Sequence, residues 1–196
     1  MQKKRYAGYI AGGILVLLGI ITITTYNSLV KKEEMVKKQW SEVQSTYQRR
    51  LDLIPNLVNV VKGVSDFEQT TLIQIAEARS RAQKGLTVTE LNRENMADQQ
   101  RLQDSVAAAT NRLIIQIERY PTLKGTAAYS GLQTQLERTE YRIKIARKDF
   151  NEAVATYNRK VRNFPSNMVA GIFGFRQKDG FTADAGTDKP VEIKFK

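Results

Sequence analysis

The fold class follows from residues 132–164, which read LQTQLERTEYRIKIARKDFNEAVATYNRKVRNF. Apolar side chains recur along this stretch at helical spacing, at Leu132, Leu136, Ile143, Ala146, Phe150, Val154, Tyr157, Val161 and Phe164. A repeat near 3.6 residues places them on one side of a helix, and Pro165 ends the run. At about 1.5 Å per residue, the pattern predicts a helix ~50 Å long.

A second long helix is predicted from about residue 29 to residue 61. Its apolar positions are Leu29, Val36, Trp40, Val43, Tyr47, Leu51, Ile54, Val58 and Val61. Pro55 lies inside this pattern and lacks the N–H that would bond to the carbonyl of Leu51. We therefore expect a kink or a local break at Pro55.

Two further helices are predicted between these long ones. Ser65-Asp66-Phe67-Glu68 fits a capping box, and Gly85 is a suitable stop for a short helix. The next helix is predicted from about residue 89 to residue 120, because apolar residues share one side before Pro121 ends it. That side carries Leu102, Val106, Ala109, Leu113, Ile117 and Tyr120. Residues 121–131 contain one proline and two glycines and predict a loop.

The N-terminal region has the composition of a membrane span. No charged residue occurs between Arg5 and Lys31, and residues 6–25 read YAGYIAGGILVLLGIITITT. About 20 apolar residues are what a helix needs to cross a bilayer, so we expect a transmembrane helix. A cleaved signal peptide is the alternative, but no small-x-small cleavage pattern follows the run. Gly8 and Gly12 have the spacing of a transmembrane helix contact, although glycine is common in such helices anyway.

These segments predict an all-α fold, in which an N-terminal transmembrane helix precedes an antiparallel four-helix bundle with long helices. The expected divisions are a basic N-terminus (1–5), the membrane helix (6–25), the bundle (26–165) and an apolar C-terminal motif with an irregular tail (166–196). Within the last division, a short amphipathic helix is expected near residues 167–173.

Composition limits the possible chemistry. The chain contains neither His nor Cys, which excludes thiol nucleophiles, imidazole bases and zinc sites built from these residues. We expect no cofactor, no metal and no enzymatic activity. The net charge of +11 favours anionic partners, and the membrane segment places lipid headgroups ahead of nucleic acid, for which no motif is present.

Polar residues surround Pro55 and form the first candidate site. Arg50, Asp52 and Asn56 are close to the proline in sequence, and an arginine or asparagine side chain is able to satisfy the carbonyl that it frees. Two interpretations remain open: a kink stabilised by an ion pair, or a partner-binding patch exposed at the bend.

The long helix at 132–164 carries a second polar group, consisting of Glu137, Glu140, Arg147 and Asn151. The last three share a face. Paired carboxylates beside an arginine are able to support acid–base chemistry or a metal, but no further ligand cluster accompanies them. A salt-bridge network across the bundle is the simpler interpretation.

Two aromatic–proline pairs, Tyr120-Pro121 and Phe164-Pro165, stand where helices are predicted to end, and core packing explains both. Phe173 belongs to a different group, the apolar residues that continue beyond the bundle. That motif has three possible contacts: the base of the bundle, another subunit, or lipid.

Several motifs resemble the LemA family. They are YNSLV at 26–30, RRLDLIPNLV at 49–58, ERYPTLK at 118–124 with Glu118 at its start, LERTE at 136–140 and FPSN at 164–167. The resemblance covers nearly the whole chain. It implies a LemA-like helical bundle behind one membrane segment at the bacterial inner membrane, with no established enzymatic activity, and it favours an extracytoplasmic bundle.

Function remains open among three non-enzymatic classes. A membrane-anchored scaffold that assembles with copies of itself is the leading hypothesis, with a homo-oligomer and the bilayer as partners. A regulatory adaptor that recruits an envelope protein is the second, and a membrane-remodelling protein acting on anionic lipid is the third.

Overall fold

The computed structural model describes residues 2–62, 68–87 and 91–181. Six helices occur in this part of the chain, and no strand does. They are α1 (Gln2–Lys62), α2 (Gln69–Gly85), α3 (Arg93–Ile117), α4 (Pro121–Lys124), α5 (Ala127–Arg162) and α6 (Ser166–Phe173). The prediction of an all-α fold with long helices is confirmed.

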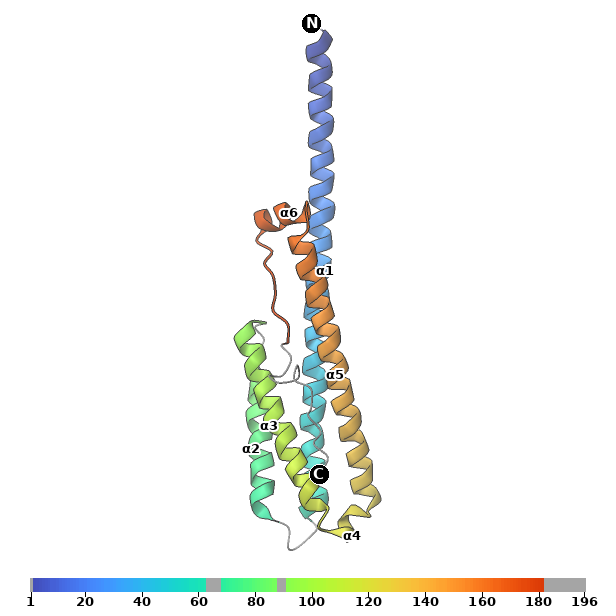
Figure 1. Cartoon of the computed structure of the whole chain (residues 1–196), viewed down its shortest axis with the longest axis vertical. Coiled ribbons are helices and arrows are strands. Elements are labelled where there is room, and N and C mark those ends of the chain that lie inside the picture. Colours follow the sequence, from blue (N-terminus) through green and yellow to red (C-terminus); the bar gives the residue numbers. More distant parts are fainter. Residues whose placement is uncertain (1, 63–67, 88–90, 182–196) are drawn as a thin grey trace, which may run out of the picture.

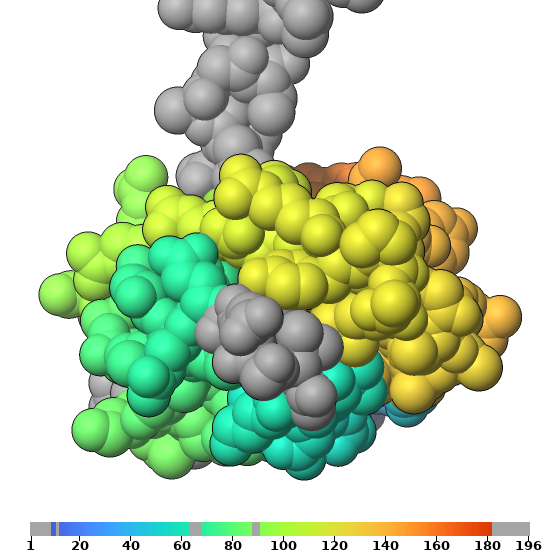
Figure 2. Space-filling view, turned by 90° about the horizontal axis from the view of Figure 1, so that it is seen from below, coloured from blue at the N-terminus to red at the C-terminus, as the bar shows by residue number. Residues whose placement is uncertain are grey.

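The helices α1, α2, α3 and α5 run alternately up and down, as in an antiparallel bundle (Figure 1). The N-terminal part of α1 projects from one end of the bundle, here called the proximal end. The opposite, distal end carries α4 (Figure 2, yellow), next to the end of α1 and the start of α2. The α1–α5 pair is much longer than the α2–α3 hairpin, which covers only its distal half (Figure 1).

Two apolar clusters form the core. The distal cluster contains Leu51 and Ile54 of α1, together with Ile75 of α2 and Leu113 of α3. The proximal cluster lies mainly between α1 and α5 and includes Trp40, Tyr47, Phe150 and Tyr157. Nearly the whole predicted stripe of α1 is buried, as is most of the predicted stripe of α5.

The part of α1 beyond the bundle exposes a row of apolar side chains. More than half of the surface of each is exposed at Tyr9, Ile10, Ile14, Leu15, Val16, Leu17, Leu18, Ile20 and Ile23. Among the residues described, α1 is the one helix whose length and composition would allow it to cross a membrane. We call residues 6–25 the apolar segment. The same helix continues from this segment to Lys62, so no break separates it from the bundle.

Some predicted helix ends are wrong. The helix α3 spans Arg93–Ile117 rather than residues 89–120, and it begins after Asn92, whose side chain accepts a 2.8 Å hydrogen bond from the N–H of Asn95. Pro121 does not end a helix but starts α4, where its missing N–H costs nothing. Most of the loop predicted at residues 121–131 is therefore helical, and α5 begins after the capping residue Thr126.

The start of α2 also differs from the prediction. Glu68 directly precedes the helix, in the capping position itself, whereas the predicted capping box required it inside the first turn. Ser65, the other member of that box, lies outside the described residues. The predicted stop at Gly85 is correct, and a Cβ there would lie 2.6 Å from Cδ1 of Leu102. Glycine thus permits the close approach of α2 and α3.

Candidate interaction surfaces

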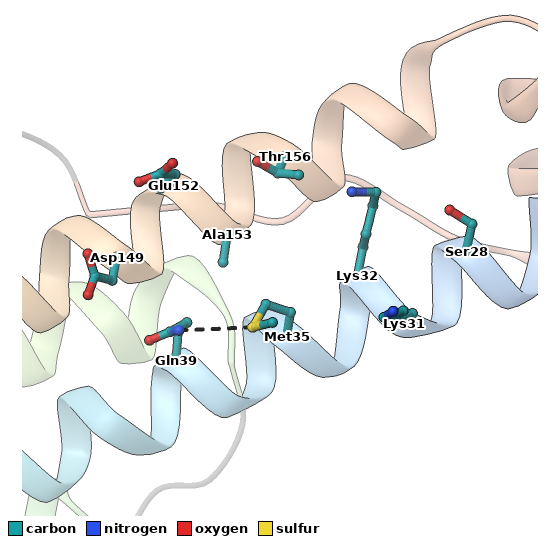
Figure 3. Close-up of a pocket in the computed structure, with 9 residues that line it drawn as sticks. All are labelled: Ser28, Lys31, Lys32, Met35, Gln39, Asp149, Glu152, Ala153 and Thr156. Carbon is teal, nitrogen blue, oxygen red and sulfur yellow. Dashed lines mark hydrogen bonds between the residues drawn. The ribbon is translucent and has the colours of Figure 1, made fainter.

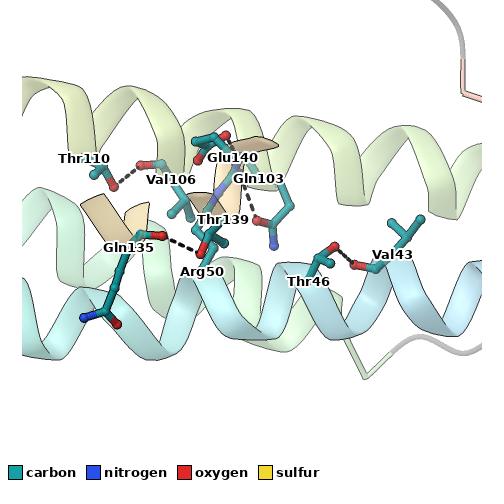
Figure 4. Close-up of polar contacts among 9 residues, drawn as sticks. All are labelled: Val43, Thr46, Arg50, Gln103, Val106, Thr110, Gln135, Thr139 and Glu140. Atoms are coloured by element: carbon teal, nitrogen blue, oxygen red, sulfur yellow. Dashed lines mark hydrogen bonds and ion pairs between the residues drawn. The ribbon is translucent and has the colours of Figure 1, made fainter. Parts of the chain in front are cut away.

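A buried arginine links three helices of the distal half. Arg50 of α1 is almost fully buried, and its Nη1 donates to the backbone oxygen of Gln103 at 3.1 Å and to its Oε1 at 3.2 Å. Its Nη2 forms an ion pair with Glu140 of α5 (Figure 4). A buried charge is tolerated when it is paired and hydrogen-bonded, and both Nη groups meet that requirement, whereas the buried Nε has no hydrogen-bond partner among the described residues. Arg50 therefore ties α1 to both α3 and α5.

The ion pair of Arg50 is made with another helix and not with a neighbour of Pro55. Arg50 turns to Glu140, and the Oδ1 of Asp52 instead accepts a 2.7 Å hydrogen bond from Gln48 on the same helix. Asp52 and Asn56 are both exposed on the surface of α1. These two residues remain available for an external contact.

Pro55 causes no break, since α1 continues through it to Lys62. Proline cannot donate to the carbonyl of Leu51, and the Nε of Arg79 in α2 donates to that oxygen instead, at 2.9 Å. An arginine side chain satisfies the carbonyl, as the sequence suggested, but it comes from another helix. Contact with α2 thus keeps α1 hydrogen-bonded through the proline.

The polar residues of α5 do not form one network. Glu137 accepts a hydrogen bond from Gln133, and Glu140 joins Arg50. Arg147 lies over the ring of Phe181 at 4.7 Å. No group of three or more acidic residues able to hold a metal occurs among the described residues. Glu140 and Arg147 thus make contacts between segments, whereas the hydrogen bond of Glu137 lies within α5.

The segment that follows α6, residues 174–181, lies along the proximal half of the α1–α5 pair, and we call it the strap (Figure 1). Asn158 donates to the backbone oxygen of Lys178 at 2.7 Å and accepts from its N–H at 2.8 Å. Asn151 makes the same two contacts with Phe181, at 3.1 and 2.8 Å. Each asparagine thus binds a backbone unit as a neighbouring strand would.

The spacing of the two asparagines matches the strap. Seven helical residues rise about 10.5 Å, and three extended residues span about 10 Å. Side chains strengthen the attachment, because the Lys178 Nζ lies 2.9 Å from the Glu33 Oε1, and Phe181 packs against Trp40 and Phe150. The sequence analysis missed Asn158; the signal was its seven-residue spacing from Asn151.

On the opposite side of the α1–α5 pair, two hollows are lined by α1 and α5 alone among the described residues, and we call this side the open groove. The two hollows adjoin, with volumes of about 510 and 650 Å³, and share Asp149. Their walls include the exposed apolar side chains of Met35, Tyr141 and Ile145. In the first hollow, Lys32 of α1 and Glu152 of α5 stand on facing helices (Figure 3). The open groove therefore combines apolar surface with charges of both signs.

The proximal end carries α6. Its Val169 and Ala170 are buried against Leu29 of α1, and the ring of Phe173 meets that of Tyr26 with centroids 4.9 Å apart. Phe164 is 80% exposed, so the core packing predicted for it is wrong.

The remaining candidate residues occupy the two ends of the molecule. Tyr120, by contrast with Phe164, is partly buried against the distal cluster, and Glu118 pairs with Lys124. A Cβ placed at Gly12 would meet no atom within 4 Å beyond the neighbouring backbone of its own helix, in the described part of the chain. Gly8 also lies in the projecting part of α1.

A comparison of the chain with known protein families identifies its family. The model of the LemA family matches residues 39–195, which include most of the bundle, α6 and the strap. The chain belongs to the LemA family. For this LemA-family protein, the match begins next to Trp40 and therefore leaves the apolar segment outside it.

Known relatives are distant in sequence but similar over most of their length. Two magnetosome proteins MamQ of Paramagnetospirillum magneticum are each 26% identical over 184 residues, covering 85% of this chain and 68% of theirs. Protein LemA of Metamycoplasma hominis is 25% identical over 144 residues, covering 74% of this chain and 63% of its own. The similarity extends across the LemA-family bundle.

Proposed function

We propose that this LemA-family protein is a membrane-anchored, non-enzymatic helical scaffold that assembles with copies of itself at the bacterial cell envelope. The observation that carries the proposal is the unbroken helix α1, which joins the exposed apolar segment to the core of the bundle. An apolar helix of this length is stable in a bilayer and unfavourable in water. Because no hinge intervenes, the bundle is held at a fixed orientation to the anchor.

Self-assembly is proposed to use the open groove. The apolar side chains of Met35, Tyr141 and Ile145 are exposed there, and their burial by a second copy would be favourable. Lys32 and Glu152 provide opposite charges that would set the register of two copies. The anchor holds all copies parallel, which favours a lateral contact along this groove.

Cysteine crosslinking in membranes tests this contact. The chain has no cysteine, so Ile145→Cys introduces a single reactive thiol in the open groove. Ile115→Cys is the matched control, because Ile115 is an exposed isoleucine on α3, away from the groove. A bifunctional maleimide is expected to give dimers with Ile145→Cys alone. Equal yields at both positions, or monomer at both, would contradict assembly through the groove.

A regulatory adaptor is the second candidate, supported by the charges of both signs in the open groove. In this case the groove would receive a helix from a different envelope protein, and the complex would dissociate as salt rises. Affinity purification at low and high salt tests this. Recovery of the chain alone at both salt concentrations would exclude the adaptor.

The orientation proposed for the bundle is extracytoplasmic. A membrane-impermeant maleimide applied to intact cells is then expected to label Ile115→Cys, since Ile115 is exposed on the bundle surface. Labelling only after the cells are lysed would place the bundle in the cytoplasm.

A further inference from the structure

The position of α6 along α1 is defined by two contacts. Phe173 packs against Tyr26, and Val169 and Ala170 pack against Leu29. Residues 6–25 account for about 30 Å of helix, which is the thickness of bilayer hydrocarbon. The uncharged run of α1 ends at Val30. The contacts therefore place α6 at the level where α1 would leave the hydrocarbon.

The outer side of α6 is apolar. Its sequence, SNMVAGIF, contains only two polar residues, and one of these, Ser166, is buried. Met168 is 61% exposed, Ile172 77% and Phe173 51%. Met168 and Ile172 are four residues apart and so share a face, while Val169 and Ala170 face the bundle. A helix without a polar outer side is unfavourable in water.

Basic residues occur next to α6 along the chain and at the same level of α1. The last turn of α5 carries Arg159, Lys160 and Arg162 directly before α6. Lys31 and Lys32 follow the uncharged run of α1. Cations at this level match the phosphates of a bilayer surface, and each gains favourable energy near anionic lipid. Apolar residues with a basic border are the pattern of a helix that lies in the membrane interface.

We infer that the outer side of α6, together with Phe164, inserts into the headgroup region of a lipid bilayer. The protein then contacts the membrane twice, through the apolar segment and through α6, which lies across the end of the bundle (Figure 1). The second contact fixes the tilt and rotation of the bundle on the membrane. This inference rests on the proposal that the apolar segment spans the bilayer.

Depth-dependent fluorescence quenching in vesicles tests the inference on the full chain. Three single-cysteine variants, Ile172→Cys, Leu17→Cys and Tyr141→Cys, are labelled with an environment-sensitive fluorophore. Each is reconstituted in phosphatidylethanolamine–phosphatidylglycerol vesicles that carry a spin label either at the headgroup or deep in the acyl chain. We expect the headgroup label to quench position 172, the deep label to quench position 17, and neither to quench position 141.

The possible outcomes distinguish the contact of α6 with lipid from the membrane span of the apolar segment. Quenching at position 17 without quenching at position 172 overturns the contact of α6 with lipid and leaves the membrane span intact. Quenching at position 172 alone supports the surface contact but contradicts the span. A blue-shifted but unquenched probe at position 172 would mean that protein, such as a second copy, covers α6, and would also overturn the inference.

Discussion

The distal and proximal halves of the α1–α5 pair are closed in different ways. In the distal half, the α2–α3 hairpin completes a four-helix core, and Arg50 and Arg79 make hydrogen bonds between helices. In the proximal half, the strap and α6 take the place of the hairpin. Two continuous helices thus support two kinds of packing. We expect the distal half to carry the stability and the proximal half to open first.

Removal of the buried charge in the distal half should have the largest effect. Arg50→Met leaves Gln103 and Glu140 without their partner, and removing one member of a buried pair costs about 3 kcal/mol. We place the cost at this lower end of the range because half of the Glu140 side chain is exposed and can rehydrate. Chemical denaturation in detergent measures the loss.

Lys37→Met is the matched control for this prediction. Lys37 forms an ion pair with Glu34, but both side chains are well exposed. We expect no measurable change in stability. Equal effects of the two variants would show that the Arg50 contacts do not hold the distal half together.

The strap should be detachable without unfolding the hairpin. Asn158→Ala removes two hydrogen bonds to Lys178, a loss of about 2 kcal/mol at ~1 kcal/mol for each bond. Hydrogen exchange at the amides of Lys178 and Phe181 is expected to accelerate, while the amides of α2 and α3 keep their protection. Asn111→Ala, at an exposed asparagine of α3, is the control. Faster exchange throughout the bundle would contradict separate stability of the two halves.

A double-mutant cycle measures how strongly the hydrogen bond from Arg79 to the carbonyl of Leu51 depends on Pro55. Arg79→Met should destabilise the protein by about 1 kcal/mol, because the carbonyl of Leu51 loses its donor. In a Pro55→Ala background, residue 55 regains an N–H for this carbonyl, so the same change should cost less. Unfolding free energies of the four proteins give the coupling. Additive effects would show that Arg79 acts elsewhere.

The last prediction concerns a group that has no effect on stability at neutral pH and acts only in alkaline solution. Burial raises the pKa of Tyr47 to about 12, above its value of about 10 in an unfolded chain. The folded protein therefore holds this proton more tightly, so the contribution of Tyr47 to stability is constant below pH 10 and is lost as pH rises toward 12. Tyr47→Phe should weaken that decline, as followed by thermal unfolding at pH 9 to 12. If the decline is the same in the variant, the pKa of Tyr47 does not differ between the folded and unfolded protein, which would contradict the prediction.

The sequence predicted the apolar stripes of both halves better than the contacts between elements. Leu51 and Ile54 belong to a periodic stripe, and periodicity is visible in one helix at a time. The partners of Arg50 could not be predicted from the sequence, because its contacts with Gln103 and Glu140 depend on how α3 and α5 align with α1.

The strap shows the limit of periodicity most clearly. It has no repeat of its own, and its position comes from Asn151 and Asn158, two side chains on another element. The prediction of core packing for Phe164 was wrong for a related reason. An aromatic residue before a proline resembles a core residue in sequence, but Phe164 is 80% exposed. Its role depends on the surroundings of the proximal end rather than on its own helix.

The mass of the intact protein, extracted in mild detergent and measured by light scattering, tests the proposed scaffold most directly. We predict a defined oligomer that persists on dilution and is lost when Tyr141 and Ile145 are both replaced by Asp in the open groove. A strictly monomeric protein, in detergent and in native membranes alike, would contradict self-assembly.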